Sequence, residues 1–176
     1  ILRGLVGSEM CIRDRTAMYG TGGLIDMNTT QEVAQRQEKH VLLGISQMWE
    51  ALVFSTAADI WGDVPYSQAA SADFVQPKFD SQKEVHDAML SLIDDAITNF
   101  DKGQVFTLPS DFDFTFSSDV EKWKRAAHTL KSRILLNWAE VESNNYSLAL
   151  EAAQGGITDE SGDGDWKALH LSLIHI

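Results

Sequence analysis

Cysteine and the common catalytic motifs are nearly absent from this sequence. Its only cysteine is Cys11, and it has no His-Glu-x-x-His zinc pattern, no glycine-rich phosphate loop and no Gly-x-Ser-x-Gly nucleophile turn. Those chemistries need their residues at fixed spacings, so their absence speaks against a zinc protease, a P-loop nucleotide hydrolase or an α/β-hydrolase. We also find no run long and apolar enough to span a membrane.

Basic residues are scarce. Lysine and arginine number 14 against 26 aspartates and glutamates, which gives a formal net charge of −12. A surface this acidic repels phosphate backbones, so we exclude nucleic acid as a partner and favour neutral ligands. Solubility alone would explain the acidity equally well. Hydrophobic residues make up 44% and charged residues 23%, a composition typical of a globular domain.

Both ends of the chain carry a sequence that we interpret as foreign to the protein. Residues 171–176 can be encoded by the reverse complement of a DNA word that encodes residues 10–15 in another frame. That word resembles the mosaic end of a sequencing-library transposon. We therefore expect residues 1–15 and 171–176 to be adapter-derived and residues 16–170 to be the natural segment. Cys11 then lies outside it, and the remaining residues carry no signal about redox compartment.

Hydrophobic periodicity predicts an all-α fold. Apolar residues recur at helical spacing over 30–62, with a possible bend near Gly44, and again over 82–101, over 118–143 and over 146–154. Thr29 or Thr30 can cap the first helix. Trp49, Trp123 and Trp138 fit core positions on these stripes, as do Val141, Leu148, Ala149, Ala152 and Ala153.

Glycines and capping boxes mark where these helices start and stop. Gly62 and Gly103 predict helix ends. Ser81-Gln82-Lys83-Glu84 and Ser118-Asp119-Val120-Glu121 both match a capping box, in which the serine and glutamate satisfy each other's free amides.

The segments between the helices read as loops. In 63–80 we expect Tyr66, Phe74 and Phe79 to fold back onto the helices. In 103–117 the alternation Phe112-x-Phe114-x-Phe116 allows a short strand, but we interpret it as a loop.

The helix pair joined near Asn144 has the layout of a tetratricopeptide-like hairpin. Small residues in the first helix are followed by a turn and then by tyrosine and alanine positions in the second. A single hairpin does not establish a repeat, although helical repeats need neighbours to cover their faces.

Three segments follow one another along the chain in a recognisable order. They are Ala58-Asp59-Ile60-Trp61-Gly62-Asp63-Val64-Pro65-Tyr66-Ser67-Gln68-Ala69, the run Pro77-Lys78-Phe79-Asp80-Ser81-Gln82 leading to Leu92-Ile93-Asp94-Asp95-Ala96-Ile97, and Lys122-Trp123-Lys124-Arg125-Ala126-Ala127-His128-Thr129-Leu130-Lys131-Ser132-Arg133. This ordered set resembles the SusD/RagB family of nutrient-binding outer-membrane lipoproteins. Together they cover most of 30–155. His128 departs from the asparagine often found there, which puts one local hydrogen bond in doubt.

The resemblance implies a fold and a role. It implies a fragment of a SusD-like all-α domain built on tetratricopeptide-like antiparallel helix hairpins with long loops. It also implies a non-catalytic lipoprotein on the outer face of the outer membrane in Bacteroidota-type bacteria, without a cofactor. Its partner would be a SusC-like TonB-dependent transporter, to which it delivers an oligosaccharide or peptide. The lipid anchor would lie outside this fragment, because the residues before Cys11 do not match a lipobox.

Trp61, Asp63 and Tyr66 are the candidate ligand-binding residues. Aromatic faces stack on sugar rings and a carboxylate accepts hydrogen bonds from hydroxyls. The favoured interpretation is structural: Trp61 seals the end of the helix and Tyr66 anchors the loop.

Asp159, Ser161, Asp163 and Asp165 match the start of a calcium loop, because oxygen ligands alternate around a glycine. The twelfth position is His170, where a glutamate is expected, so a solvated acidic loop is the favoured interpretation and we predict no metal site.

Two further functions stay open. A helical-repeat scaffold for protein partners would have the same helices. A glycoside-processing enzyme would need two carboxylates across one cleft, and the adjacent pair Asp94-Asp95 points to different faces of its helix. His40, His86 and His128 are each alone on their helices and are expected to be surface or satisfied core histidines.

Overall fold

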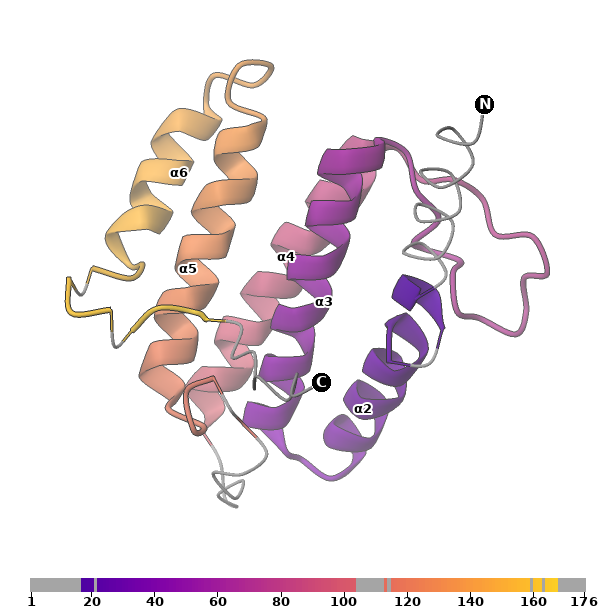
Figure 1. The fold of residues 1–176 in the computed structure, drawn as a ribbon, viewed down its shortest axis with the longest axis horizontal. Helices are drawn as coiled ribbons and strands as arrows, with labels where there is room; N and C mark the ends of the chain where they lie inside the picture. Colours follow the sequence, from indigo (N-terminus) through magenta and orange to yellow (C-terminus); the bar gives the residue numbers. More distant parts are fainter. Residues whose placement is uncertain are drawn as a thin grey trace, which may run out of the picture.

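The computed structural model describes residues 17–20, 22–103, 113, 115–158, 160–162 and 164–167. In these ranges the chain is helical: α2 (Leu24–Arg36), α3 (His40–Trp61), α4 (Gln82–Lys102), α5 (Val120–Asn137) and α6 (Asn145–Gln154). Figure 1 shows α3 to α6 side by side and alternating in direction, with α2 on the far side of α3. The described residues form no strand, only an isolated bridge between Val64 and Asp80. The prediction of an all-α fold with antiparallel hairpins is confirmed.

The predicted helix over 30–62 is wrong, because two helices occupy this stretch. Helix α2 begins at Leu24, so neither Thr29 nor Thr30 caps it, and it ends at Arg36. Glu38 then takes a left-handed conformation with a φ of 54°, and the chain reverses before α3 starts at His40. No bend falls near Gly44, which is buried inside α3 against the ring of Phe100. A polar run over 35–39 interrupts the apolar pattern, and the reversal lets α2 pack back on α3.

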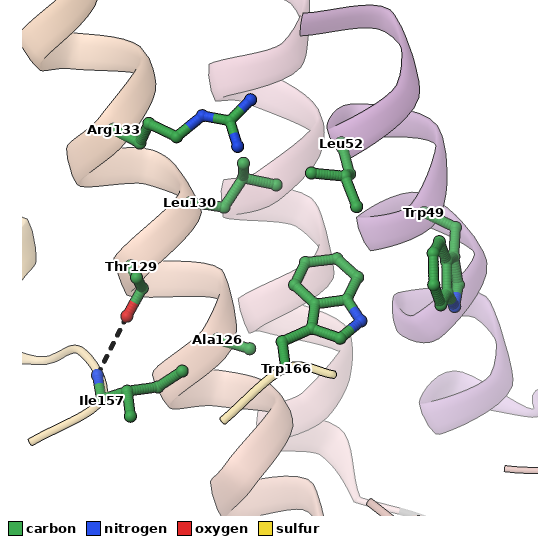
Figure 2. A pocket seen from close by; sticks show the side chains of 8 residues that line it. All are labelled: Trp49, Leu52, Ala126, Thr129, Leu130, Arg133, Ile157 and Trp166. Atoms are coloured by element: carbon green, nitrogen blue, oxygen red, sulfur yellow. Dashed lines mark hydrogen bonds between the residues drawn. The ribbon is translucent and has the colours of Figure 1, made fainter. Parts of the chain in front are cut away.

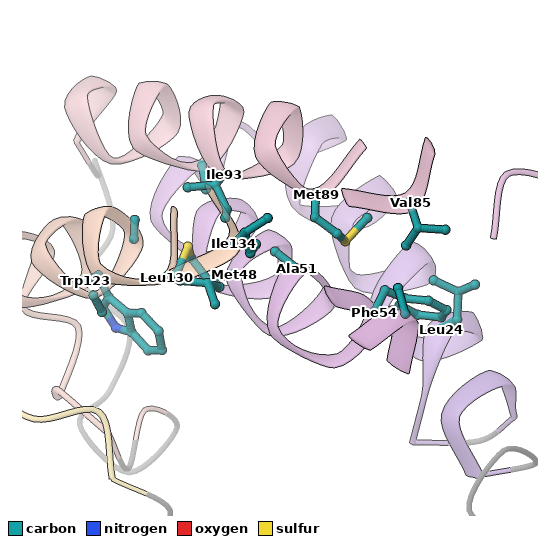
Figure 3. Close-up of a cluster of buried hydrophobic side chains, with 14 of the residues drawn as sticks. Leu24, Met48, Ala51, Phe54, Val85, Met89, Ile93, Trp123, Leu130 and Ile134 are labelled. Atoms are coloured by element: carbon teal, nitrogen blue, oxygen red, sulfur yellow. The ribbon is translucent and has the colours of Figure 1, made fainter. Parts of the chain in front are cut away.

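The main apolar core of the described residues lies where α3, α4 and α5 meet, with α2 covering one end of it, and a smaller cluster of Leu135, Ala149 and Ala152 joins α5 to α6. Figure 3 shows Met48 and Phe54 of α3, Met89 and Ile93 of α4 and Trp123 of α5 pointing into this space. All five side chains are 0% exposed. Burying a side chain of this size stabilises a fold by about 1.5–3 kcal/mol. The core prediction for Trp123 is therefore confirmed, whereas Trp49 is 36% exposed and lies at the edge of a pocket described below.

The two predicted capping boxes have different outcomes. Ser81 caps α4 as predicted: its hydroxyl accepts a hydrogen bond from the amide of Glu84, whose carboxylate accepts one from the amide of Ser81. The second prediction is wrong, because Asp119 caps α5 by accepting from the amides of Glu121 and Lys122. Ser118 has a φ of 64°, outside the extended conformation of a capping residue.

Helix α5 is shorter than its apolar stripe predicts. It ends at Asn137, and the carbonyls of Leu135 and Leu136 accept from the amides of Trp138 and Ala139, the tight spacing of a turn. Val141 is consequently 72% exposed, which corrects its placement in the core. In α6, Ala149 and Ala152 are buried as predicted, while Leu148 and Ala153 are exposed. Trp138 is half-buried and lies against His86 of α4.

The expectation that no run is long and apolar enough to span a membrane is wrong for α3. Its 22 residues are long and apolar enough by length and composition, with a mean hydropathy of 1.3. Of the apolar window, 67% is buried inside the protein. Its apolar residues thus have packing partners on α2, α4 and α5, as in the central helix of a helical domain.

The loops between helices are held by polar contacts more than by aromatic ones. Phe74 is 45% and Phe79 67% exposed, so the prediction that they fold back is wrong, while Tyr66 packs on Phe54 with ring centroids 5.0 Å apart. Phe116 is buried against Trp123, and its segment over 115–118 is a turn. Phe112 and Phe114 lie outside the described residues.

Candidate functional site

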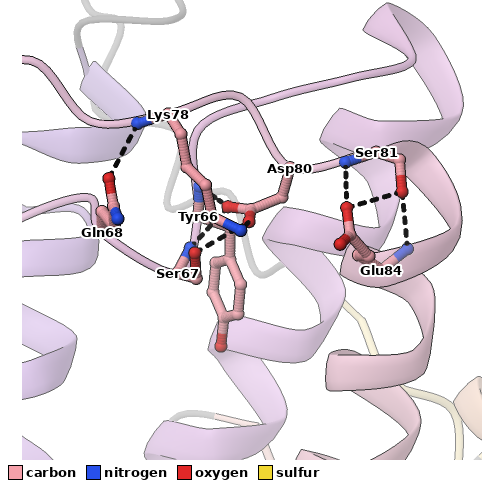
Figure 4. Close-up of polar contacts among 7 residues, drawn as sticks. All are labelled: Tyr66, Ser67, Gln68, Lys78, Asp80, Ser81 and Glu84. Atoms are coloured by element: carbon pink, nitrogen blue, oxygen red, sulfur yellow. Dashed lines mark hydrogen bonds and ion pairs between the residues drawn. The ribbon is translucent and has the colours of Figure 1, made fainter.

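Asp80 organises the loop that follows α3. Figure 4 shows its carboxylate at the centre of the turn formed by Tyr66 and Ser67. It accepts hydrogen bonds from the amide of Tyr66 at 2.9 Å and from the amide and hydroxyl of Ser67, each at 2.7 Å. Lys78 Nζ lies 2.9 Å from it. Burial opposes its charge, but the hydrogen bonds from Lys78, Ser67 and Tyr66 outweigh burial and lower the pKa of Asp80 to about 2.

The three candidate ligand-binding residues lie at this end of α3. Trp61 is half-buried at the last position of the helix, and Asp63 is exposed, with Oδ1 accepting from the amide of Gln82 at 3.1 Å. Tyr66 donates its hydroxyl to Oε1 of Glu50 at 2.7 Å. Burial, followed by the charge of Glu50, raises the pKa of Tyr66. The hydroxyl of Tyr66 therefore serves the loop anchor, while Trp61 packs partly against the core and Asp63 holds the first amide of α4.

A line of buried polar side chains runs along α3, and the sequence analysis did not predict it. Glu50 is 4% exposed and also accepts from Nε2 of Gln31 at 2.5 Å, which links α2 to α3. Gln47 is 7% exposed and accepts from Nδ2 of Asn99 at 2.9 Å, which links α3 to α4. The available signal was the spacing of Gln47 and Glu50, three residues apart within an otherwise apolar helix.

A pocket of about 290 Å³ lies between α3 and α5 under the segment that follows α6. Figure 2 shows Trp49 and Leu52 on one side, Ala126, Thr129, Leu130 and Arg133 on the other, and Trp166 and Ile157 reaching over from that segment. Ile157 donates its amide to Oγ1 of Thr129 at 2.9 Å. Trp166 contacts Trp49 and Trp123 edge-on, with centroids 5.1 and 5.4 Å apart. The pocket is mainly apolar, and its lining comes from α3, from α5 and from the segment that follows α6.

The calcium-loop alternative falls partly outside the described residues, since Asp159 and Asp163 are not among them. Asp165 lies 3.6 Å from Nζ of Lys167, which also donates to the carbonyl of Gly162 at 2.6 Å. A lysine ammonium thus sits beside the described half of this loop. Among the described residues, no group of three or more His, Cys, Asp or Glu side chains could hold a metal ion.

The described helices define a class: an all-α domain of antiparallel hairpins in the manner of tetratricopeptide-like proteins. A family model described as "Starch-binding associating with outer membrane" matches residues 16–164. The chain belongs to this SusD-like family. A search of curated proteins finds no match.

Solved structures agree with the assignment. A SusD/RagB family protein from Bacteroides thetaiotaomicron is 30% identical, with a TM-score of 0.63 over 69% of this chain and 25% of its own. A SusD homolog from Bacteroides uniformis is 26% identical, with a TM-score of 0.63 over 77% of this chain and 27% of its own.

A third structure shows similarity in fold alone. A chitin-binding protein is 22% identical, with a TM-score of 0.74 over 86% of this chain and 32% of its own. The chain thus spans about a quarter to a third of the length of these structures.

Proposed function

We propose that this chain is part of a non-catalytic glycan-binding lipoprotein that caps a SusC-like TonB-dependent transporter at the outer face of the outer membrane. The observation that carries the proposal is the match of the starch-binding, outer-membrane family model to residues 16–164. The net charge of −12 is consistent with a neutral ligand. An oligosaccharide is favoured over a peptide, because the family description names starch and one relative in fold is a chitin-binding protein.

The corner formed by Trp61, Asp63 and Tyr66 is the proposed ligand contact within this chain. Trp61 supplies an aromatic face that stacks on the C–H face of a sugar ring, and Asp63 supplies an acceptor for its hydroxyls. Tyr66 contributes by fixing the loop through Glu50, with its own hydroxyl turned inward.

The absence of catalysis is part of the proposal. Asp94 and Asp95 are adjacent on α4 and so point to different faces of the helix, and Nζ of Lys131 lies 2.5 Å from Oδ1 of Asp94. A purified protein that released reducing sugar from starch or chitin fragments would contradict this part.

The test begins with the complete gene. We expect a signal peptide that ends in a lipobox cysteine, a transporter gene next to it, and co-purification of the two proteins from outer membranes. We also expect the full-length protein to bind a soluble starch or chitin oligosaccharide in calorimetry. A full-length protein without a lipobox and without a transporter in the purified complex would overturn the transporter role.

Variants then test the ligand contact. Trp61→Ala should weaken binding at least tenfold, a loss of about 1.4 kcal/mol. Asp63→Asn should weaken it less, because an amide still accepts a hydrogen bond. The matched control is Asp73→Asn on the exposed part of the same loop, which should bind as the wild type does. Equal binding by Trp61→Ala and the wild type would remove this corner from the ligand site.

A helical-repeat scaffold for protein partners is the second candidate. It is favoured by the exposed apolar side chains of the α5–α6 hairpin: Leu136 at 55%, Val141 at 72% and Leu150 at 62%. Faces of this kind are covered by a neighbouring element in helical repeats. A full-length protein that captured a protein partner and bound no glycan would favour this function.

A further inference from the structure

Another concave site lies at the start of α3, at the opposite end of this helix from Trp61. It has a volume of about 510 Å³ and lies between α2, the start of α3 and the last turns of α4. Its polar lining comprises Gln31, Gln35, His40, Gln47, Thr98 and Asn99. Ligand pockets commonly measure about 300–1,000 Å³, so this one is large enough for a small molecule.

The glutamine and asparagine side chains of the lining offer both hydrogen-bond donors and acceptors. Each primary amide carries two N–H donors and one carbonyl acceptor. Gln47 and Asn99 are joined by a hydrogen bond of 2.9 Å, which ties α3 to α4 at this pocket.

The charges at the rim select against an ionic ligand. Glu38 and Asp95 contribute two carboxylates, and Lys102 is the one lysine among the lining residues. Lys102 Nζ already donates to Oδ1 of Asn99 at 3.3 Å. An anion would meet two negative charges, and a cation would gain little from carboxylates open to water. Amides and carboxylates together suit a neutral molecule rich in hydroxyl groups.

We propose that this amide-lined pocket binds a neutral saccharide. The amide of Gln35 donates to or accepts from its hydroxyls, Nε2 of Gln47 donates to them, and Oγ1 of Thr98, whose proton goes to the carbonyl of Asp94, accepts from them. The proposal takes its ligand class from the proposed function but places a second sugar site on α2, α3 and α4, away from the corner at Trp61. With a site at each end of α3, the same domain could hold one long oligosaccharide at two points or two separate oligosaccharides.

The experiment compares two double variants of the chain by calorimetry and by NMR of the side-chain amides. The probes are maltotriose and N,N′-diacetylchitobiose, with trigalacturonate as the charged counterpart. Gln35→Leu with Thr98→Val removes polar groups from the exposed wall of the pocket and keeps its shape. The matched control is Gln154→Leu with Thr158→Val, an exposed glutamine and threonine outside this pocket.

We expect a neutral probe to shift the amide resonances of Gln35, Gln47 and Asn99, and the pocket variant to bind at least tenfold more weakly than the control. Trigalacturonate should bind neither variant measurably. The proposal is overturned if the pocket variant and the control bind a neutral probe equally, or if neither probe binds the chain. If Trp61→Ala abolishes glycan binding and the pocket variant binds as the control does, the proposed function stays in place and this second site is removed. If the full-length protein binds no glycan, the proposed function fails instead.

Discussion

The indole Nε1 of Trp138 donates a hydrogen bond to Nδ1 of His86 and so joins the end of α5 to the second turn of α4. His86 is 1% exposed, and its Nε2 lies 3.0 Å from Oδ1 of Asp59 on α3, at an angle outside normal hydrogen-bond geometry. Asn137 donates to the other oxygen of Asp59 at 2.8 Å. Three helices that are distant in sequence thus share one buried polar contact, in which Nδ1 is the acceptor and Nε2 carries the proton.

Trp138→Phe should destabilise the protein by about 1–3 kcal/mol, because it leaves Nδ1 of His86 buried without a donor. Urea unfolding followed by circular dichroism measures the loss. The control is Trp49→Phe, the same change at a tryptophan that is 36% exposed on the rim of the apolar pocket. If both variants lose the same free energy of unfolding, the loss comes from the smaller ring and not from the hydrogen bond of Trp138.

Asp80→Asn should lower the free energy of unfolding at pH 7 by about 2 kcal/mol. The folded pKa of Asp80 is about 2, below the unfolded value near ~3.9. A carboxyl with a lowered folded pKa contributes its full stability above the unfolded pKa and loses it as the pH falls toward the folded pKa. The wild type should therefore lose its advantage over the variant between about pH 4 and pH 2. Urea unfolding across that window tests this.

Asp73→Asn provides the control for Asp80, since Asp73 is an exposed aspartate in the same loop. It should change the free energy of unfolding little at any pH in the window. A wild-type advantage over Asp80→Asn that stayed constant down to pH 2 would contradict the assignment of the lowered pKa to Asp80.

Asp119→Ala should cost about 1 kcal/mol, because it removes the acceptor for two amides at the start of α5. Ser118→Ala should cost clearly less, although Ser118 and Glu121 match a capping box in sequence. Ser81→Ala, at a capping box that does form, should match the loss of Asp119→Ala. Thermal or urea unfolding of the three variants ranks them, and a larger loss for Ser118→Ala than for Asp119→Ala would contradict the observed cap.

Gly44→Ala tests packing against helix propensity. Propensity alone predicts a gain of about 0.5–1 kcal/mol from alanine inside a helix. The added Cβ would lie 2.6 Å from Cε1 of Phe100, which is 1% exposed and has no room to move. We expect a loss of about 1–3 kcal/mol. In the background Phe100→Leu the same change should cost less, and an unchanged cost there would show that Phe100 is not the obstacle.

Local signals predicted one helix almost to the residue. The apolar stripe from Val85 to Phe100, the capping box at Ser81 and the glycine at 103 are all close in sequence to what they control, and α4 runs from Gln82 to Lys102. The family resemblance also rested on local, ordered motifs, and the family model confirms it.

The errors lie where the backbone departs from the regular helical pattern. Glu38 and Ser118 take left-handed conformations, so the chain reverses at the first and the cap moves to Asp119 at the second, and α5 ends at Asn137 before its apolar stripe does. The ligand-binding role of Trp61 and the adapter origin of residues 1–15 and 171–176 stay predictions, as does the interpretation of 159–165 as a solvated acidic loop.

The sequence by itself determined that the chain is helical, where most helices lie and to which family it belongs, because periodicity, caps and motifs act over a few residues. Only the tertiary structure decided which polar side chains go inside. Glu50, Gln47 and His86 are buried because Tyr66, Asn99 and Trp138 reach them from other segments. A polar group is stable inside a protein when such a partner replaces its hydrogen bonds to water. The sequence of the helix that carries the group does not identify that partner, because the partner lies in a distant segment.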